Sequence, residues 1–120
     1  MYNNIMTMKY IPTPYSYSSA VAAGDLVFLG LHRGFGGRFS DQLEGIFAGL
    51  KVTLAELGLG LEHIARVNVW LNNIQDLPEM EKIFLRYFEK DHYPARMTAT
   101  TQFIDADCLV MVDGVAYLKT

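Results

Sequence analysis

Arg96 is the side chain in this sequence whose type and setting best suit chemistry. It follows Tyr93-Pro94-Ala95 and opens a segment, Met97-Thr98-Ala99-Thr100, of apolar and hydroxyl-bearing residues. A guanidinium presents five donors in a fixed plane and can bind a carboxylate through two parallel hydrogen bonds. Because an unpaired buried charge is costly, an arginine in a partly buried strand needs an acidic partner. Arg96 therefore predicts either a ligand carboxylate or a structural ion pair. For the ion pair, the candidate partners are Asp113, Glu81 and Asp105.

Other residue types that often carry catalysis form no recognisable motif. The histidines, His32, His63 and His92, lie far from one another in the sequence. None stands at metal-ligand spacing from a Cys, an Asp or a second His, so we expect no metal site and no cofactor. The single cysteine, Cys108, excludes an internal disulfide and is expected to be buried and inert.

The glycine-rich stretch 32–38 superficially resembles a phosphate-binding loop. It lacks the lysine and the strand-to-helix spacing of such loops, so we interpret it as a turn that carries Arg33 and Arg38 into solvent.

Composition limits the class of protein. With 120 residues, the chain is expected to form one domain over residues 1–120. A hydrophobic fraction of 51% against 19% charged residues favours a globular fold with some surface covered by a partner chain. The net charge of −3 gives little attraction for phosphate, so nucleic acid is not the expected partner. There is no signal-peptide pattern and no apolar run near the ~20 residues of a membrane-spanning helix, which predicts a cytoplasmic protein.

Alternating and continuous apolar runs predict strands near residues 5–8, 17–22, 26–31, 65–71, 96–102 and 108–118. Pro12 and Pro14 are expected to break the pairing of the first strand. The run Leu26-Val27-Phe28-Leu29 is apolar throughout, which predicts a strand covered on both faces.

Two amphipathic helices are expected between these strands. The first has Ser40 as N-cap and stops at Gly58, and Gly45 and Gly49 would let another backbone approach it closely. The second has Asp76 as N-cap and ends near residues 92–94. Their apolar stripes are Leu43, Ile46, Phe47, Leu50, Leu54 and Leu57 on the first, and Leu77, Met80, Ile83, Phe84, Tyr87 and Phe88 on the second. One stripe per helix predicts an α+β fold with both helices on one face of a mixed β-sheet.

Three stretches of the chain resemble the RidA/YjgF family. They are residues 17–21 followed by Gly24-Asp25-Leu26-Val27-Phe28, residues 67–71 with Gln75-Asp76, and Tyr87-Phe88 leading to Pro94-Ala95-Arg96. The resemblance implies a chorismate-mutase-like domain that forms a trimeric barrel with clefts between subunits. The best-known members are imine deaminases, hydrolases that convert short 2-imino and enamino acids, such as 2-iminobutanoate and 2-iminopropanoate, to 2-keto acids and ammonia. Others are described as endoribonucleases (L-PSP-like).

The resemblance also implies roles for residues of this chain. Arg96 matches the arginine that holds the substrate carboxylate, Tyr17 matches the tyrosine that lines the cleft, and Thr98 matches the cysteine or threonine two residues past the arginine. The family's Ser-Gly-Gln falls on Gly30-Leu31-His32, so the serine is absent and the backbone N–H of Leu31 remains as the donor.

Two further positions depart from the family pattern. The asparagine of the second helix falls on Glu81, and the glutamate thought to position the hydrolytic water falls on Met111. A thioether cannot transfer a proton. Asp113 lies two residues further on and hence on the same strand face, where it is a candidate substitute acting through a water.

Two hypotheses follow. The first is a deaminase, in which Arg96 anchors the carboxylate and orientation does most of the catalytic work. The alternative is a non-catalytic trimer that binds a small carboxylate or a protein partner, motivated by Glu81 and Met111. Endoribonuclease activity is a distant third because of the acidic net charge.

Overall fold

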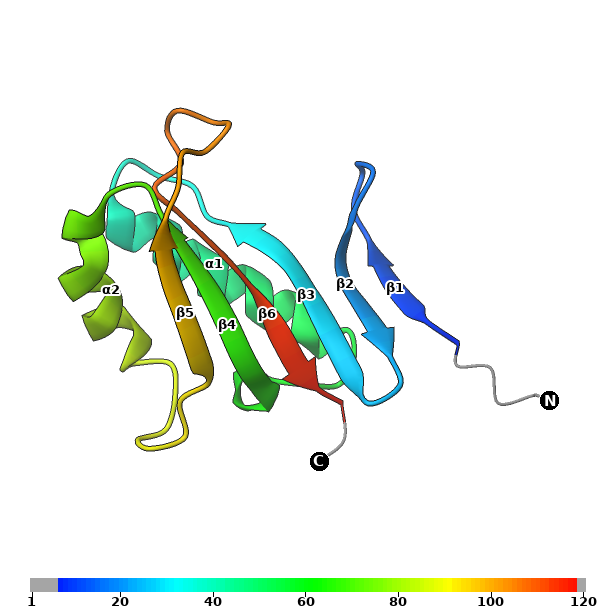
Figure 1. The fold of residues 1–120 in the computed structure, drawn as a ribbon. Coiled ribbons are helices and arrows are strands. Elements are labelled where there is room, and N and C mark those ends of the chain that lie inside the picture. The colour runs from blue at the N-terminus through cyan, green and yellow to red at the C-terminus, as the bar shows by residue number, and fades with distance from the viewer. Residues whose placement is uncertain (1–6, 119–120) are drawn as a thin grey trace.

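The computed structural model describes residues 7–118, which form a six-stranded sheet with both α-helices on one face (Figure 1). The strands are β1 (Lys9–Pro12), β2 (Ser18–Ala23), β3 (Leu26–Arg33), β4 (Ile64–Leu71), β5 (Ala95–Thr100) and β6 (Val110–Tyr117). The helices are α1 (Phe39–Ala55) and α2 (Leu77–Phe84), with 3-10 turns η2 (Leu61–His63) and η3 (Ile74–Asp76). The predicted α+β arrangement, a mixed sheet with two helices on one face, is confirmed.

The strand order β1-β2-β3-β6-β4-β5 puts the last strand, β6, in the middle of the sheet. β4 and β5 run parallel, whereas the other neighbouring strands are antiparallel. A parallel pair needs a crossover connection, and the segment containing α2 supplies it. This crossover brings α2 beside the start of β5 (Figure 1).

The core lies between the helices and the sheet. From α1 it contains Leu43, Ile46, Phe47, Leu50 and Leu54, and from the central strands Val27, Leu29, Val67, Val69, Leu71, Val110 and Val112. The Phe47 ring stacks on Tyr87 with centroids 4.1 Å apart and meets Phe84 edge-on at 5.1 Å. Such aromatic pairs add about 0.5–1.5 kcal/mol each beyond their buried area, so they help to fix α2 and the turn after it against α1.

The boundaries of three elements differ from the predictions. The first strand is Lys9–Pro12, so Pro12 is its last residue, beside an irregularity in register, and does not come after the strand as predicted. Of the predicted span 5–8, residues 5 and 6 lie outside the described residues. The N-cap of α1 is Arg38, not Ser40. α2 ends at Phe84, well before residues 92–94, because the chain continues in turns such as the Tyr87 N–H to Phe84 carbonyl bond at 3.1 Å.

The prediction that Leu26–Leu29 is covered on both faces is wrong for the single chain. Val27 and Leu29 are buried under the helices, but Leu26 and Phe28 point to the other face and are 42% and 48% exposed. Large apolar side chains near them are also exposed: Tyr10, Leu31 and Tyr117. We call the side of the sheet away from the helices the open face.

Arg33 does not project into solvent as expected. Its Nη1 lies 2.8 Å from Asp105 Oδ2 and its Nη2 lies 3.1 Å from Asp107 Oδ2. The guanidinium also covers the Phe35 ring, 4.4 Å from the centroid. The side chain is therefore fixed to the β5–β6 loop. Arg38 is exposed as predicted and pairs with Asp41. Within residues 7–118, no helix is long and apolar enough to cross a membrane.

Candidate functional site

Arg96 stands on the helix side of β5, at the edge of the sheet. The parallel register pairs Arg96 with Val67 and Thr98 with Val69 of β4. Val67 and Val69 are both buried in the core. Because side chains alternate along a strand, Arg96 and Thr98 share this face, which is the face that α2 covers.

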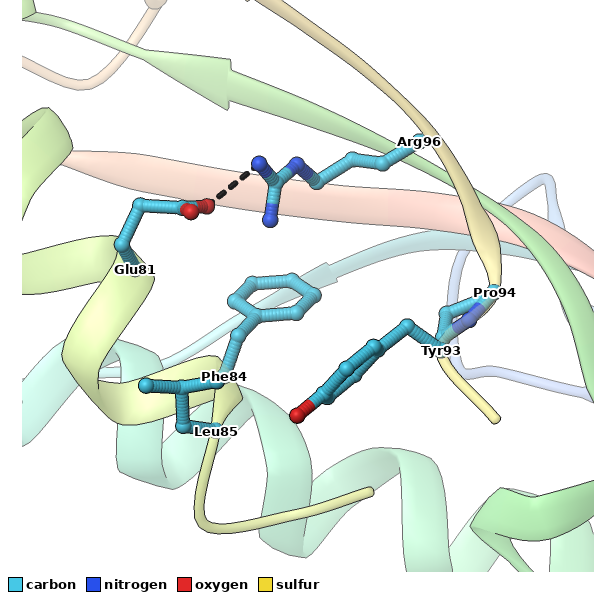
Figure 2. Close-up of a pocket in the computed structure, with 6 residues that line it drawn as sticks. All are labelled: Glu81, Phe84, Leu85, Tyr93, Pro94 and Arg96. Atoms are coloured by element: carbon cyan, nitrogen blue, oxygen red, sulfur yellow. Dashed lines mark ion pairs between the residues drawn. The ribbon is translucent and has the colours of Figure 1, made fainter. Parts of the chain in front are cut away.

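An internal acid contacts Arg96. Its Nη2 forms an ion pair with Glu81 Oε1 of α2, and its guanidinium lies 5.3 Å from the centroid of the Phe84 ring (Figure 2). The side chains of Arg96 and Glu81 are 29% and 53% exposed, so the ion pair contributes on the order of 0–1 kcal/mol. Of the three candidate partners, Asp105 pairs instead with Arg33.

A small pocket lies beside this ion pair. It has a volume of about 250 Å³ and is lined by Glu81, Phe84, Leu85, Tyr93, Pro94 and Arg96. The Phe84 ring lies under the guanidinium, and the Tyr93 hydroxyl points towards α2 across the pocket (Figure 2). Since ligand pockets for drug-sized molecules are about 300–1,000 Å³, this one suits a small metabolite with one anionic group.

Sequence reasoning missed Phe84, Leu85 and Tyr93 as lining residues. The sequence pattern places Phe84 only in the core stripe, and Tyr93-Pro94 only at a helix end. Once β4 and β5 are known to be parallel, the crossover must return α2 to the start of β5. The sequence contained no direct signal for that parallel pairing.

Tyr17 lies at the other side of the molecule. It immediately precedes β2, is 58% exposed, and stacks on Tyr15 with centroids 6.1 Å apart. Four strand-to-strand steps separate β2 from β5, a distance of roughly 19 Å at about 4.8 Å per step. One chain therefore does not bring Tyr17 and Arg96 together.

Gly30 and Leu31 occupy an irregularity in β3. The register with β6 shifts between Leu29 and His32, and Leu31 is exposed. His32 points to the helix side, where Nδ1 lies 2.7 Å from the Gly30 carbonyl and Nε2 lies 2.9 Å from Thr53 Oγ1. A carbonyl only accepts, so Nδ1 carries the proton and Nε2 accepts from Thr53. Burial lowers the pKa of His32, which favours this neutral form.

Met111 and Asp113 share the open face, as their spacing predicted. In the antiparallel register Trp70 is opposite Met111 and Asn68 is opposite Asp113. The Asp113 carboxylate accepts hydrogen bonds from Asn68 Nδ2 at 2.7 Å and from Trp70 Nε1 at 2.8 Å. The sheet therefore separates Met111 and Asp113 from the Arg96 side chain of the same chain.

Cys108 is buried, and its Sγ lies 3.5 Å from the Val110 carbonyl oxygen. Burial raises the pKa of the thiol, which disfavours the nucleophilic thiolate. Among residues 7–118, no three His, Cys, Asp or Glu side chains are grouped so as to hold a metal ion.

The fold and the pocket define a class of small α+β protein that presents an arginine at one edge of a sheet whose other face is open. Residues 8–118 match the family model described as Endoribonuclease L-PSP. A RutC family protein from Synechocystis sp. is 28% identical over 130 residues, which covers 96% of this chain and 100% of the relative. The chain belongs to the YjgF/RidA family.

Solved structures agree with this assignment. A YjgF family member from Neisseria meningitidis has a TM-score of 0.90 at 24% identity, covering 96% of this chain and 98% of the other. RidA from an Antarctic Psychrobacter species has a TM-score of 0.81 at 23% identity, covering 91% and 94%. At these identities the structures show the shared fold.

Proposed function

We propose that the chain forms a homotrimer whose intersubunit clefts hydrolyse small 2-imino acids to 2-keto acids and ammonia. The observation that carries this proposal is Arg96, which stands at the mouth of a pocket sized for a small metabolite. In one chain the remaining candidate residues lie elsewhere: Tyr17 precedes β2, and Leu31, Met111 and Asp113 belong to the open face. A neighbouring copy would supply them.

The open face supports assembly. Exposed apolar side chains on it include Leu26, Phe28, Leu31 and Tyr117. A contiguous exposed apolar surface of this kind is typical of a protein interface. A second copy would cover it, which agrees with the apolar excess of the composition.

Hydrolysis of an imine needs little catalytic assistance from the protein. Water adds to the imine carbon, both of its protons pass in turn from oxygen to nitrogen, and the C–N bond breaks to give the 2-keto acid and ammonia. Arg96 would hold the substrate carboxylate through two hydrogen bonds, with Leu31 N–H and Thr98 orienting the imine. Holding the reacting groups in place lowers the barrier without a strong base.

Met111 supplies no proton-transfer group, so this step depends on another residue or on water. Asp113 is the proposed helper. Its carboxylate oxygens each accept one hydrogen bond already, but a carboxylate has about four lone-pair sites, so it can still accept from a water.

The second candidate function is binding without turnover. It is favoured by Glu81, whose carboxylate occupies Arg96, and by Met111. Endoribonuclease activity, which the name of the family model suggests, has weaker support because a net charge of −3 attracts RNA poorly.

The decisive experiment generates 2-iminobutanoate in place and compares its loss with the spontaneous rate. We expect acceleration by the parent, loss of acceleration in Arg96→Ala, and retention in Arg38→Ala, an exposed arginine at the start of α1. Acceleration by Met111→Glu alone would favour the binding protein. If neither the parent nor any variant accelerates the reaction although all are folded, the deaminase hypothesis is refuted.

A further inference from the structure

We propose that Glu81 makes this pocket selective for zwitterionic ligands, which carry a carboxylate and a cationic nitrogen, over ligands that carry only a carboxylate. The inference deepens the proposed function, since it depends on Arg96 being the carboxylate anchor.

The charges around the pocket are few. Its charged lining residues are Arg96 and Glu81, and its other lining residues are Phe84, Leu85, Tyr93 and Pro94. The charges of the two side chains, Arg96 and Glu81, therefore cancel. With a neutral residue in place of Glu81, the same pocket would carry one positive charge and would attract any small anion.

A ligand carboxylate that binds Arg96 comes into contact with Glu81. The ion pair uses Nη2 of Arg96 (Figure 2). A guanidinium offers two edges for bidentate binding, Nη1 with Nη2 and Nε with Nη2, and both include Nη2. A ligand carboxylate that binds Arg96 in a bidentate way must therefore share Nη2 with Glu81 or displace it.

Displacement is feasible because the pair is weak. The Glu81 side chain is 53% exposed on α2, so water can solvate its carboxylate when a ligand displaces it. After displacement, its carboxylate still lies beside the ligand. Two carboxylates near one guanidinium repel each other, and a cationic nitrogen on the ligand relieves that repulsion.

The substrate and the product of the proposed reaction differ in net charge. A protonated 2-imino acid is a zwitterion with no net charge, whereas a 2-keto acid is a monoanion at neutral pH. Glu81 would therefore favour the protonated imine, which is the more electrophilic form, and would disfavour the product. The same charge promotes binding of the substrate and release of the keto acid.

The test compares two stable ligands of similar size, 2-aminobutanoate as the zwitterion and 2-oxobutanoate as the monoanion, by NMR titration. In Glu81→Gln we expect affinity for 2-oxobutanoate to rise up to about fivefold relative to 2-aminobutanoate, the upper end of the range for a partly exposed charge. The change should shrink in about 0.5 M salt, because salt screens exposed charges. Glu79→Gln removes a charge from the same helix and should leave the ratio unchanged.

The outcomes separate the two proposals. If both ligands bind and are lost in Arg96→Ala, but the ratio is the same in the parent and in Glu81→Gln, only the role of Glu81 is refuted. An equal change in Glu79→Gln would also refute it, because the effect would then reflect overall charge. If neither ligand binds the parent or Glu81→Gln, the carboxylate site itself is wrong and both proposals fail.

Discussion

Asn68 and Asp113 lie opposite each other on β4 and β6, and Asn68 Nδ2 donates a 2.7 Å hydrogen bond to the Asp113 carboxylate. Trp70 Nε1 donates to the other carboxylate oxygen at 2.8 Å. In Asp113→Asn, one of these donors would face an NH₂ group. We expect the free energy of unfolding to fall by about 1–3 kcal/mol, measured by urea titration.

The control for that variant is Asp25→Asn, in the exposed β2–β3 turn, which should be nearly neutral. Equal stability of Asp113→Asn and the parent would mean that the two hydrogen bonds contribute nothing net to folding.

Gly34 follows β3 and lies against the first turns of α1. A Cβ at Gly34 would overlap the backbone carbonyl of Gln42, which cannot move without shifting the helix. We expect Gly34→Ala to lower the free energy of unfolding by about 1–3 kcal/mol or more. Gly37→Ala, in the same loop, meets nothing within 4 Å and should change it by less than about 0.5 kcal/mol. Similar melting temperatures for the two variants would contradict this packing.

His32 should make stability depend on pH. Burial lowers its folded-state pKa below the ordinary 6.5, so the unfolded chain binds the proton more readily. Its contribution is complete above about pH 6.5 and is lost as the pH falls below that value towards the folded-state pKa. We expect urea titrations to give a lower free energy of unfolding at pH 5 than at pH 7.5.

In His32→Gln, the free energy of unfolding should fall less between pH 7.5 and pH 5 than it does in the parent. His92→Gln, whose side chain is 71% exposed, is the matched control and should retain the parent's fall. A fall that is unchanged in His32→Gln would assign the pH dependence to other groups.

Mixing two inactive variants tests whether Tyr17 and Arg96 act across subunits. Co-expressed Tyr17→Ala and Arg96→Ala chains should form mixed trimers in which roughly one quarter of the sites combine an intact Arg96 with an intact Tyr17. We expect imine hydrolysis to reappear in the mixture and to be absent from each variant alone. Mixed trimers without activity would mean that Tyr17 and Arg96 do not meet across a subunit interface, and activity of Tyr17→Ala alone would remove Tyr17 from the site.

The sequence was informative where local patterns decide structure. The Val67, Val69, Leu71 alternation predicted β4 to within one residue, and the α1 stripe predicted the helix and its buried face, because each pattern buries one face. The helix ends at Ala55, three residues before the predicted stop, and Gly58 adopts the left-handed φ of +74° in the turn that follows. The internal partner of Arg96 was among the three acids considered.

Contacts between residues far apart in the sequence could not be predicted from local patterns. Gln42 is 1% exposed, donates to the carbonyls of Gly36 and Asp107 at 2.9 Å, and accepts from Leu109 N–H at 2.8 Å. Nothing in a one-dimensional pattern distinguishes such a glutamine from one on a helix surface. The prediction for Arg33 failed for the same reason, since its acidic partners are more than seventy residues away along the chain.

The central position of β6 has a consequence for biosynthesis. Residues 110–117 are the last strand of this sheet to be synthesised, yet they lie between β3 and β4 and pair with both. Until they emerge, β3 and β4 each present an unpaired edge to the rest of the cell, and such edges are prone to pair with other chains. We infer that a nascent chain from which residues 110–117 have not yet emerged is the form most in need of a chaperone.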